Sequence, residues 1–276
     1  MYRFKRFLLL LTAVIFSQSV SAQKFTPKSR TELGFLLGGS HYFGDLNQEK
    51  LFRFTSPAAQ LLMRYNVHSR LAWRTNIGIG KVYGMDAKSS DPLLMNRNLS
   101  FKSIILEAST GVEFHYLKFQ IGHRKYNFTH YILAQIGLFY MNPKAELNGT
   151  WYNLRDVGTE GQGTSLTDQK RYGLIQLCVP LGLGFKFSPN ERISIGLEYG
   201  IRKTFTDYLD DVKSNTYVLK SRMAEENSEV AAQLSNRSLD QNDYGVRGNA
   251  NTKDWYSFFG LTVTIQIGKH NPCVQP

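Results

Sequence analysis

Residues 173–187 read GLIQLCVPLGLGFKF, a stretch apolar enough for a membrane but shorter than the roughly 20 residues that a spanning helix needs. It also contains Pro180, Lys186 and several glycines, which suit such a helix poorly. Read in steps of two, the odd-numbered residues from Ile175 to Phe187 are all apolar, while the even-numbered ones include Gln176 and Lys186. This alternation predicts a strand with one face toward lipid and the other toward a polar interior. Because proline has no N–H for a sheet ladder, we expect a local bulge or distortion at Pro180.

The same alternation recurs along the chain and predicts an all-β fold, an eight-stranded antiparallel transmembrane β-barrel of the outer membrane. Each segment is long enough for the roughly 9–11 residues with which a tilted strand crosses a bilayer. Helical periodicity is limited to a mostly polar window at 222–234. The predicted strands are 31–43, 57–67, 70–83, 101–116, 127–141, 171–187, 192–207 and 254–267.

The connections between these segments alternate in length, which predicts the orientation of the barrel. Those at 68–70 and 188–191 are tight and that at 117–126 is intermediate, whereas those at 44–56, 84–100, 142–170 and 208–253 are longer. Outer-membrane barrels have short periplasmic turns and long external loops, so we place the longer connections outside. Aromatic residues at the external strand ends are expected to form an interfacial girdle, consisting of Tyr42, Phe43, Tyr83, Tyr140, Tyr172, Phe205, Tyr208 and Trp255.

The N-terminus has the features of a secretory signal peptide, with Arg3, Lys5 and Arg6 before a short apolar core and a small-residue site ending at Ala22. We predict a signal peptide at 1–22, an outer-membrane β-barrel at 23–268 and a periplasmic C-terminal tail at 269–276. This organisation predicts the outer membrane of a Gram-negative bacterium as the location.

The charge and the cysteines narrow the range of partners. The net charge is +11, and removal of a signal peptide with three cations and no acids leaves about +8. A diffuse positive charge suits outer-membrane lipid and lipopolysaccharide, and the absence of a compact Lys/Arg run argues against nucleic acid. Cys178 falls on the inward face of its strand and Cys273 in the tail, so we expect no bridge between them.

The strand parity also predicts the contents of the lumen. Four acids and four bases should point inward, and buried charges of this kind must be paired or hydrated. An eight-stranded barrel is just wide enough to be filled by side chains, so we predict a structural ionic plug rather than a conducting pore. The alternative is a role in handling protons or a substrate. The residues are Glu32, Arg64, Arg74, Glu107, Glu113, Lys186, Glu198 and Arg202.

No residue pattern indicates catalysis, and we predict that the protein is not an enzyme and has no cofactor, metal or small-molecule substrate. The six histidines show no metal-ligand spacing. The alternative is a hydrolase or acyltransferase at the external rim, in which His41 and Asp45 would converge with Asp207 or Asp211.

Four stretches together carry a family resemblance: ELGFLLGGSHYFGDLN (32–47), HYILAQIGLFYMNPKAELNGTWYNLRDVGTEGQG (130–163), RKTFTDYLDDV (202–212) and RGNANTKDWYSFFGLTV (247–263). The combination resembles the PorG family, small outer-membrane barrels of the Bacteroidetes type IX (Por) protein secretion machinery. The resemblance implies a non-enzymatic component above a periplasmic ring built from the lipoprotein PorK and from PorN. It implies no catalytic residues. The tail and the 213–246 segment lie outside the matched stretches.

The implied ring would contact the periplasmic side of the barrel, where the connection at 117–126 is longer than a minimal turn. Its basic turn at 123–125 suits an acidic partner surface. The contact candidates are His68, Ser69, Arg70, His123, Arg124, Lys125, Asn190, Lys269 and His270. The alternative function is that of a general OmpA-like or OmpX-like barrel that stiffens the envelope or mediates adhesion.

Overall fold

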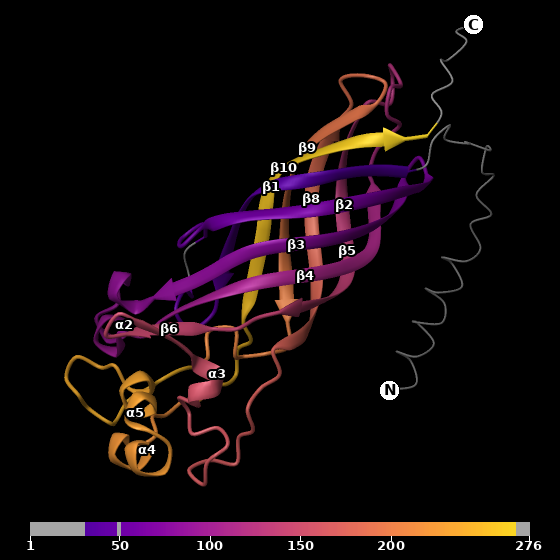
Figure 1. The fold of residues 1–276 in the computed structure, drawn as a ribbon. Helices are drawn as coiled ribbons and strands as arrows, with labels where there is room; N and C mark the ends of the chain where they lie inside the picture. Colours follow the sequence, from indigo (N-terminus) through magenta and orange to yellow (C-terminus); the bar gives the residue numbers. More distant parts are fainter. Residues whose placement is uncertain (1–30, 49–50, 269–276) are drawn as a thin grey trace, which may run out of the picture.

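The computed structural model describes residues 31–48 and 51–268, and it forms a closed antiparallel β-barrel (Figure 1). Each strand pairs with its neighbour in the chain order, β10 pairs with β1, and the pairing of β3 with β4 completes the ring. This confirms the predicted fold class of an eight-stranded antiparallel barrel. The barrel strands are β1 (Thr31–Phe43), β2 (Ser56–His68), β3 (Leu71–Met85), β4 (Ser100–His115), β5 (Phe128–Tyr140), β8 (Ile175–Phe187), β9 (Ile193–Thr204) and β10 (Trp255–Ile267).

The strand that contains Pro180 keeps its register. On the β9 side the pairing is continuous from Cys178 opposite Thr204 to Phe187 opposite Ile195. On the β5 side the pairs next to Pro180 are missing, yet the register is the same on both sides of the gap. The proline therefore interrupts the ladder locally without a bulge, because its missing N–H removes a hydrogen bond but adds no residue.

Strand β8 begins at Ile175, four residues later than the sequence predicts. The carbonyl of Tyr172 accepts a hydrogen bond from Arg155 Nε at 2.7 Å, and the carbonyl of Leu174 accepts one from Met141 N at 2.9 Å. Residues 171–174 thus bond to the preceding external loop and belong to it.

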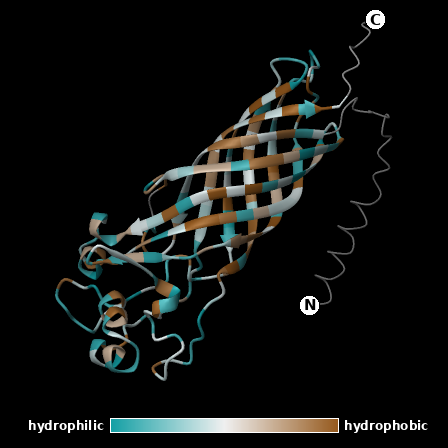
Figure 2. Cartoon of the chain, viewed as in Figure 1, coloured by the Kyte–Doolittle hydropathy of each residue, from teal (hydrophilic) through white to brown (hydrophobic). Residues whose placement is uncertain are grey.

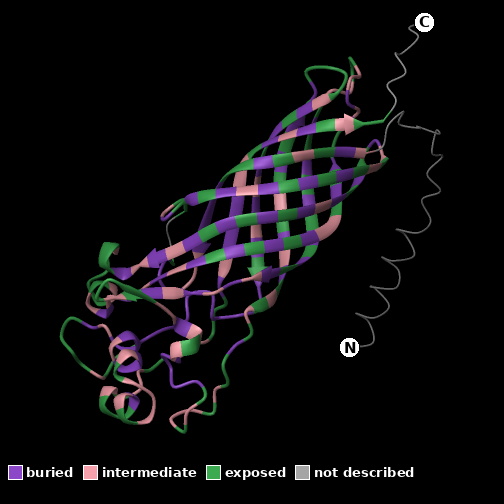
Figure 3. Ribbon diagram, in the orientation of Figure 1, coloured by how far each residue is buried: buried purple, intermediate pink, exposed green. Residues whose placement is uncertain are grey.

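The outer surface of the barrel is a continuous apolar belt. Most outward residues in the middle of the strands are exposed and apolar, and most inward ones are buried (Figures 2 and 3). On β3, for example, the outward residues Ile77 and Ile79 are exposed, whereas the inward residue Asn76 is 1% exposed. A surface of this kind is stable only against lipid or another apolar phase, so the architecture is that of a transmembrane barrel. Among the described residues, no helix has the length and apolar character needed to cross a membrane.

The long connections gather at one end of the barrel and fold into a compact unit, which we call the cap (Figure 1). The cap contains the strands of a hairpin, β6 (Lys144–Leu147) and β7 (Thr150–Asn153), which the sequence analysis missed. A single pairing, Lys102 opposite Lys144, joins this hairpin to β4. The remaining elements are η1 (Asp86–Lys88), α2 (Pro92–Arg97), α3 (Leu154–Val157), α4 (Lys220–Glu226) and α5 (Glu229–Ser235).

Local sequence explains the short helices of the cap. Asp91 caps α2 by accepting a hydrogen bond from Leu93 N, and Pro92 stands at the first helical position. Ser228 caps α5 by accepting one from Ala231 N. Helices α4 and α5 fall in and around the predicted helical window at 222–234, so the long 213–246 segment is structured. The predicted signal peptide at 1–22 and the predicted tail at 269–276, which contains Cys273, lie outside the described residues.

Candidate functional site

The structure places all eight charged residues assigned to the lumen in the barrel interior. Each has a relative exposure of 4% or less, and each forms an ion pair with another member of the set. Four carboxylates therefore balance four cations inside a narrow, buried space. Such an arrangement fills the lumen with side chains, as expected for an eight-stranded barrel.

Glu113 on β4 is the centre of this network. Its Oε2 accepts hydrogen bonds from Arg64 Nε at 2.8 Å and from Arg74 Nη1 at 3.2 Å. Its Oε1 accepts one from Lys186 Nζ at 2.7 Å and lies 3.0 Å from His115 Nε2. This one carboxylate thus connects β2, β3, β4 and β8 across the lumen. It forms ion pairs with three of the four lumen cations, more than any of the other three lumen carboxylates does.

The network continues from Arg74 toward β9. Arg74 forms a two-point ion pair with Glu198, and Tyr131 donates a hydrogen bond to the same carboxylate at 2.6 Å. Gly184 on β8 makes room for the Tyr131 ring, because a Cβ there would lie 2.7 Å from that ring and 2.6 Å from the Leu197 carbonyl oxygen. The inward glycine in the stretch quoted first is thus required by the polar core.

A second ion pair lies nearer the cap. Arg202 Nε donates to Glu107 at 3.0 Å, and Tyr256 donates to the same carboxylate at 2.9 Å. Ser109 joins this pair to the rest of the network, since its hydroxyl donates to Glu107 at 3.1 Å and lies 3.3 Å from Gln135 Oε1. Tyr131, Tyr256 and His115 also belong to the network, although they are not among the eight residues predicted from the sequence. The inward parity of their strands is the signal that identifies them.

The end of the barrel opposite the cap is closed by the connection between β4 and β5. Phe119 and Ile121 are 5% and 8% exposed, and the Phe119 ring lies 4.5 Å from Lys186 Nζ. Phe119 N donates to the Ser69 carbonyl at 2.9 Å, and Gly122 N donates to the Ser188 hydroxyl at 3.1 Å. Part of this connection therefore folds inward as a plug, while Arg124 and Lys125 stay exposed, so its contact with a periplasmic partner stays a prediction.

The turns at this end present a basic surface. Arg70, Lys118, Arg124, Lys125 and Arg192 are all exposed, and Glu191 is the only acid among the described residues of these turns. We call these five residues the basic end. A surface with this charge balance attracts an acidic macromolecular surface or anionic headgroups.

The contact candidates named from the sequence differ in their accessibility. Arg70, Arg124, Lys125 and Asn190 are exposed, and His68 and His123 are half-buried. His123 Nδ1 accepts hydrogen bonds from the backbone of the same turn. Ser69 is 3% exposed, and its carbonyl accepts from Phe119, so it supports the turn rather than presenting a surface. Lys269 and His270 lie outside the described residues.

Three of the tyrosines expected in the external girdle are buried. Tyr42, Tyr172 and Tyr208 are 0%, 7% and 7% exposed, and they lie beneath the cap. Tyr42 donates hydrogen bonds to Asp210 and, at 3.2 Å, to Asp254. Tyr172 donates to Asp211 at 2.7 Å. Position at a strand end therefore does not predict that a tyrosine is exposed to the membrane interface. The inward parity of Tyr42 on β1 would have placed it correctly.

Two arginines hold the cap loops together. Arg97 forms a two-point ion pair with Asp86, with distances of 2.6 and 2.8 Å, and also donates to the carbonyls of Asp45 and Arg247. Arg247 donates to Glu160 at 2.6 Å and to the carbonyls of Asp211 and Ser235. Each guanidinium connects loops that are far apart in sequence, so the cap is a single packed unit.

The acids of the cap are strongly affected by burial. Desolvation raises the pKa of Asp210 and Asp254 well above the usual range, and the proximity of the other carboxylates adds to this. Desolvation also raises the pKa of Asp211 to about 7, although Arg247 opposes it. These carboxyls hold protons at pH values where an exposed aspartate is charged. Among the described residues, no group of three His, Cys, Asp or Glu side chains is placed to hold a metal ion.

The residues of the hypothetical rim enzyme do not converge. His41 faces the outer surface of β1, where its ring nitrogens lie 2.8 and 3.0 Å from the Ser257 hydroxyl and its ring packs against Phe52 and Phe259. Asp45 lies under the cap and accepts from Asn249 N. Asp207 pairs with Lys253 and Asp211 with Tyr172, so no two members of the set share a hydrogen bond.

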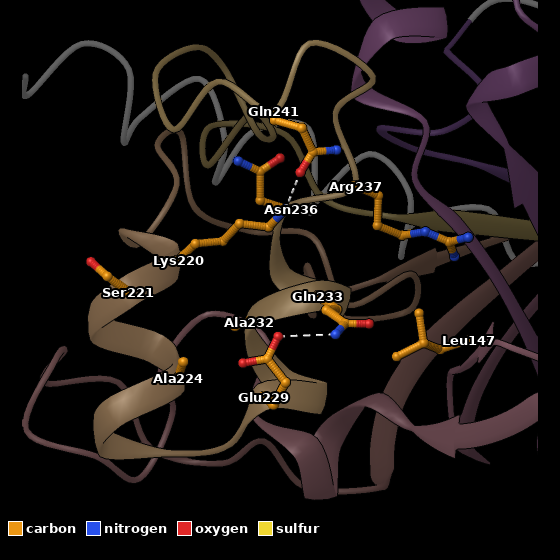
Figure 4. A pocket seen from close by; sticks show the side chains of 10 residues that line it. All are labelled: Leu147, Lys220, Ser221, Ala224, Glu229, Ala232, Gln233, Asn236, Arg237 and Gln241. Atoms are coloured by element: carbon orange, nitrogen blue, oxygen red, sulfur yellow. Dashed lines mark hydrogen bonds between the residues drawn. The ribbon is translucent and has the colours of Figure 1, made fainter.

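The cap has a recess of about 630 Å³ on its surface, between α4, α5 and the end of the β6 strand (Figure 4). Its lining is mostly polar, with Lys220, Gln233, Gln241 and Arg237 among the residues around it. Lys220 Nζ donates to Gln241 at 2.6 Å, and Gln233 donates to Glu229 at 2.9 Å. Four of the polar side chains of the recess thus bond to one another in two pairs.

Comparisons with known proteins give one family match and several similar structures. The family model described as "Domain of unknown function (DUF6089)" matches residues 5–230. No curated protein matches the sequence significantly. Neisserial surface protein A is similar, with a TM-score of 0.40 and 8% identity over 86% of this chain and 97% of that one. The attachment invasion locus protein Ail of Yersinia pestis has a TM-score of 0.40 and 10% identity, over 88% of this chain and 100% of that one. OprG of Pseudomonas aeruginosa has a TM-score of 0.38 and 9% identity, over 87% of this chain and 98% of that one.

Proposed function

We propose a role in protein secretion for this chain, which belongs to the DUF6089 family: it is a non-enzymatic outer-membrane barrel that anchors the periplasmic PorK and PorN ring of the type IX machinery. The outer membrane is the membrane in which closed barrels with an apolar belt occur. The resemblance of four sequence stretches to the PorG family supports the secretion pathway and the ring as partner.

The observation that carries the proposal is the basic end of the barrel. Five exposed cations surround the plugged mouth on the side of the short turns, which the orientation rule places in the periplasm. Because the lumen is filled by ion pairs and closed by Phe119, we assign the protein an anchoring role rather than that of a conduit. Docking on a rigid, charged face requires no opening of the barrel.

Co-purification tests the docking surface. The variant R124E/K125E reverses two exposed charges at the basic end, and we expect it to recover far less PorK and PorN from detergent-solubilised outer membrane than wild type does. The matched control is K170E/R171E, which reverses an equally adjacent, exposed Lys-Arg pair in the cap. Charge reversal is preferable to shortening the 117–126 connection, because Phe119 and Ile121 plug the barrel.

Equal recovery of the ring by wild type and by R124E/K125E would remove the basic end as its docking surface. The alternative function, a general structural or adhesion barrel like OmpA or OmpX, is favoured by the ordered cap, which presents a packed polar surface to the exterior. Normal secretion in a deletion strain would support that alternative.

A further inference from the structure

A second basic feature lies on the outside of the barrel, where β3 and β4 leave the apolar belt. It is a cleft of about 420 Å³ between these two strands and the β6–β7 hairpin of the cap. The residues that line it include Lys81, Lys102, Glu146, Trp151 and Arg237. We call it the rim cleft.

The depth of the rim cleft follows from the strand register. Lys81 is the next outward residue after Ile79 on β3, and Lys102 is the last one before Ile104 on β4. Lys81 pairs with Ile104 and Lys102 pairs with Tyr83 across the two strands, so both lysines stand at the cap-side edge of the apolar belt. Ile79 and Ile104 are 52% and 56% exposed and face lipid. The two ammonium groups are therefore at the level of lipid headgroups on the cap side.

The rim cleft carries more positive charge than it neutralises. Lys144 stands directly opposite Lys102 in the β4–β6 pairing, and none of Lys81, Lys102 and Lys144 has a salt bridge among the described residues. Within the described part of the chain, Glu146 is the only acid that lines the cleft. Like charges placed side by side in this way repel each other, and an anion bound between them would relieve that repulsion.

Arg237 is the third cation that lines the rim cleft, after Lys81 and Lys102, and hydrogen bonds hold it in place. Its Nη1 donates to the Ser100 hydroxyl and to the Glu146 carbonyl, both at 3.2 Å, so it is fixed by neutral acceptors. Partial burial lowers the pKa of Arg237, and the nearby Glu146 carboxylate opposes this shift. Trp151 forms a wall against the Lys102 side chain and is itself 45% exposed. An amphipathic aromatic wall is typical of the lipid–water boundary.

We propose that the rim cleft binds the phosphorylated sugar headgroup of lipopolysaccharide in the outer leaflet. Lysine and arginine side chains around one concave site bind phosphate oxygens through charge-assisted hydrogen bonds. The acyl chains of the lipid would pack on the exposed side chains of Ile79 and Ile104 next to the cleft, a contact that a free phosphate ion cannot make. The assignment rests on the outer-membrane orientation in the proposed function, because lipopolysaccharide lies on the external side.

Native mass spectrometry of the full-length protein in detergent, titrated with diphosphorylated lipid A, tests the site. Wild type is expected to bind one lipid A, and K81Q/K102Q to bind it about thirtyfold more weakly, since each basic residue near an anionic surface contributes roughly a factor of five. K102R keeps the charge and should bind like wild type. The matched control is K203Q, because Lys203 is also an outward lysine at the external rim beside a tryptophan, Trp255, but it does not line the rim cleft.

The heat-dependent shift in gel mobility verifies that each variant is folded before binding is measured. Equal affinity of wild type and K81Q/K102Q, or an equal loss in K203Q, would overturn the proposal. Binding of dephosphorylated lipid A or phosphatidylglycerol as tightly as diphosphorylated lipid A would overturn the assignment to lipopolysaccharide, as would full competition by millimolar inorganic phosphate. The measurement contains no secretion protein, so its outcome is independent of whether the PorK and PorN ring docks.

Discussion

Replacing Glu113 by glutamine removes the charge at the centre of the lumen network and keeps the shape of the side chain. In the wild type this carboxylate faces Arg64 at 2.8 Å, Arg74 at 3.2 Å and Lys186 at 2.7 Å. The variant leaves those three cations with only Glu32 and Glu198 as close carboxylate partners. Breaking a buried ion pair from one side costs about 3–5 kcal/mol, and we expect the free energy of unfolding to fall by that amount.

Urea titration of the refolded barrel in lipid vesicles measures the change. Unfolding is followed by tryptophan fluorescence and, in parallel, by the gel mobility shift of the folded form. The midpoint should move to lower urea without a change in slope, because the surface exposed on unfolding is the same. Arg192→Gln at an exposed turn position is the control and should change the free energy by less than about 0.5 kcal/mol.

A double variant separates charge balance from the loss of one contact. E113Q/K186M removes one negative and one positive charge, so the lumen is neutral again. We expect it to be more stable than the sum of the two single changes predicts, by about 1–3 kcal/mol. Strict additivity, or a cost for E113Q below about 1 kcal/mol, would refute the view that the ion pairs hold the barrel together.

Three further predictions concern packing, the cap and pH. Gly184→Ala should destabilise the barrel by about 1–3 kcal/mol in the same urea assay, because the new Cβ would lie 2.7 Å from the Tyr131 ring, whereas Gly173→Ala, whose nearest neighbour would be 3.6 Å away, should have little effect. Arg97→Met leaves the buried Asp86 carboxylate without its partner, so limited proteolysis should cut the cap faster while the gel mobility shift of the barrel stays unchanged. Folding raises the pKa of Asp211 to about 7 from the usual 3.8, so the folded cap binds this proton more tightly than the unfolded cap. Cap stability should therefore fall by about 4 kcal/mol as the pH rises from about 4 to 7. Hydrogen exchange of residues 205–254 measures this slope, and superimposable wild-type and Asp211→Asn profiles would contradict it.

The barrel could be predicted from sequence because its rule is local. The alternation of apolar and polar residues with a period of two determines which side of each strand faces lipid. A charged residue such as Lys186 marks the inward side, because a charge on the lipid side would destabilise the barrel. The same parity placed the lumen charges. It did not identify which of them pair, since Glu113 meets Arg64 and Lys186 from strands far apart in the sequence.

The cap and the plug could not be predicted in the same way. Their burial comes from loops folding over the mouths of the barrel, and no periodic pattern records such a contact. Tyr172 and Tyr208 look like girdle residues by position but stack on each other with ring centroids 4.4 Å apart beneath the cap. Phe119 likewise reads as part of a surface turn and closes the lumen instead.

The seam between the first and last strands constrains the order of assembly. Thr31 pairs with Ile267 and Phe43 with Trp255, so the ring cannot close until the end of the chain has been made. The seam is also where Thr264 on β10 reaches Glu32 on β1, at 2.8 Å. Contacts of such long sequence separation form late in folding. Until that step an open sheet exposes two unpaired edges and half-solvated charges to its surroundings. A factor that assists the assembly of this barrel would therefore act by covering the free edges of β1 and β10 until these two strands pair.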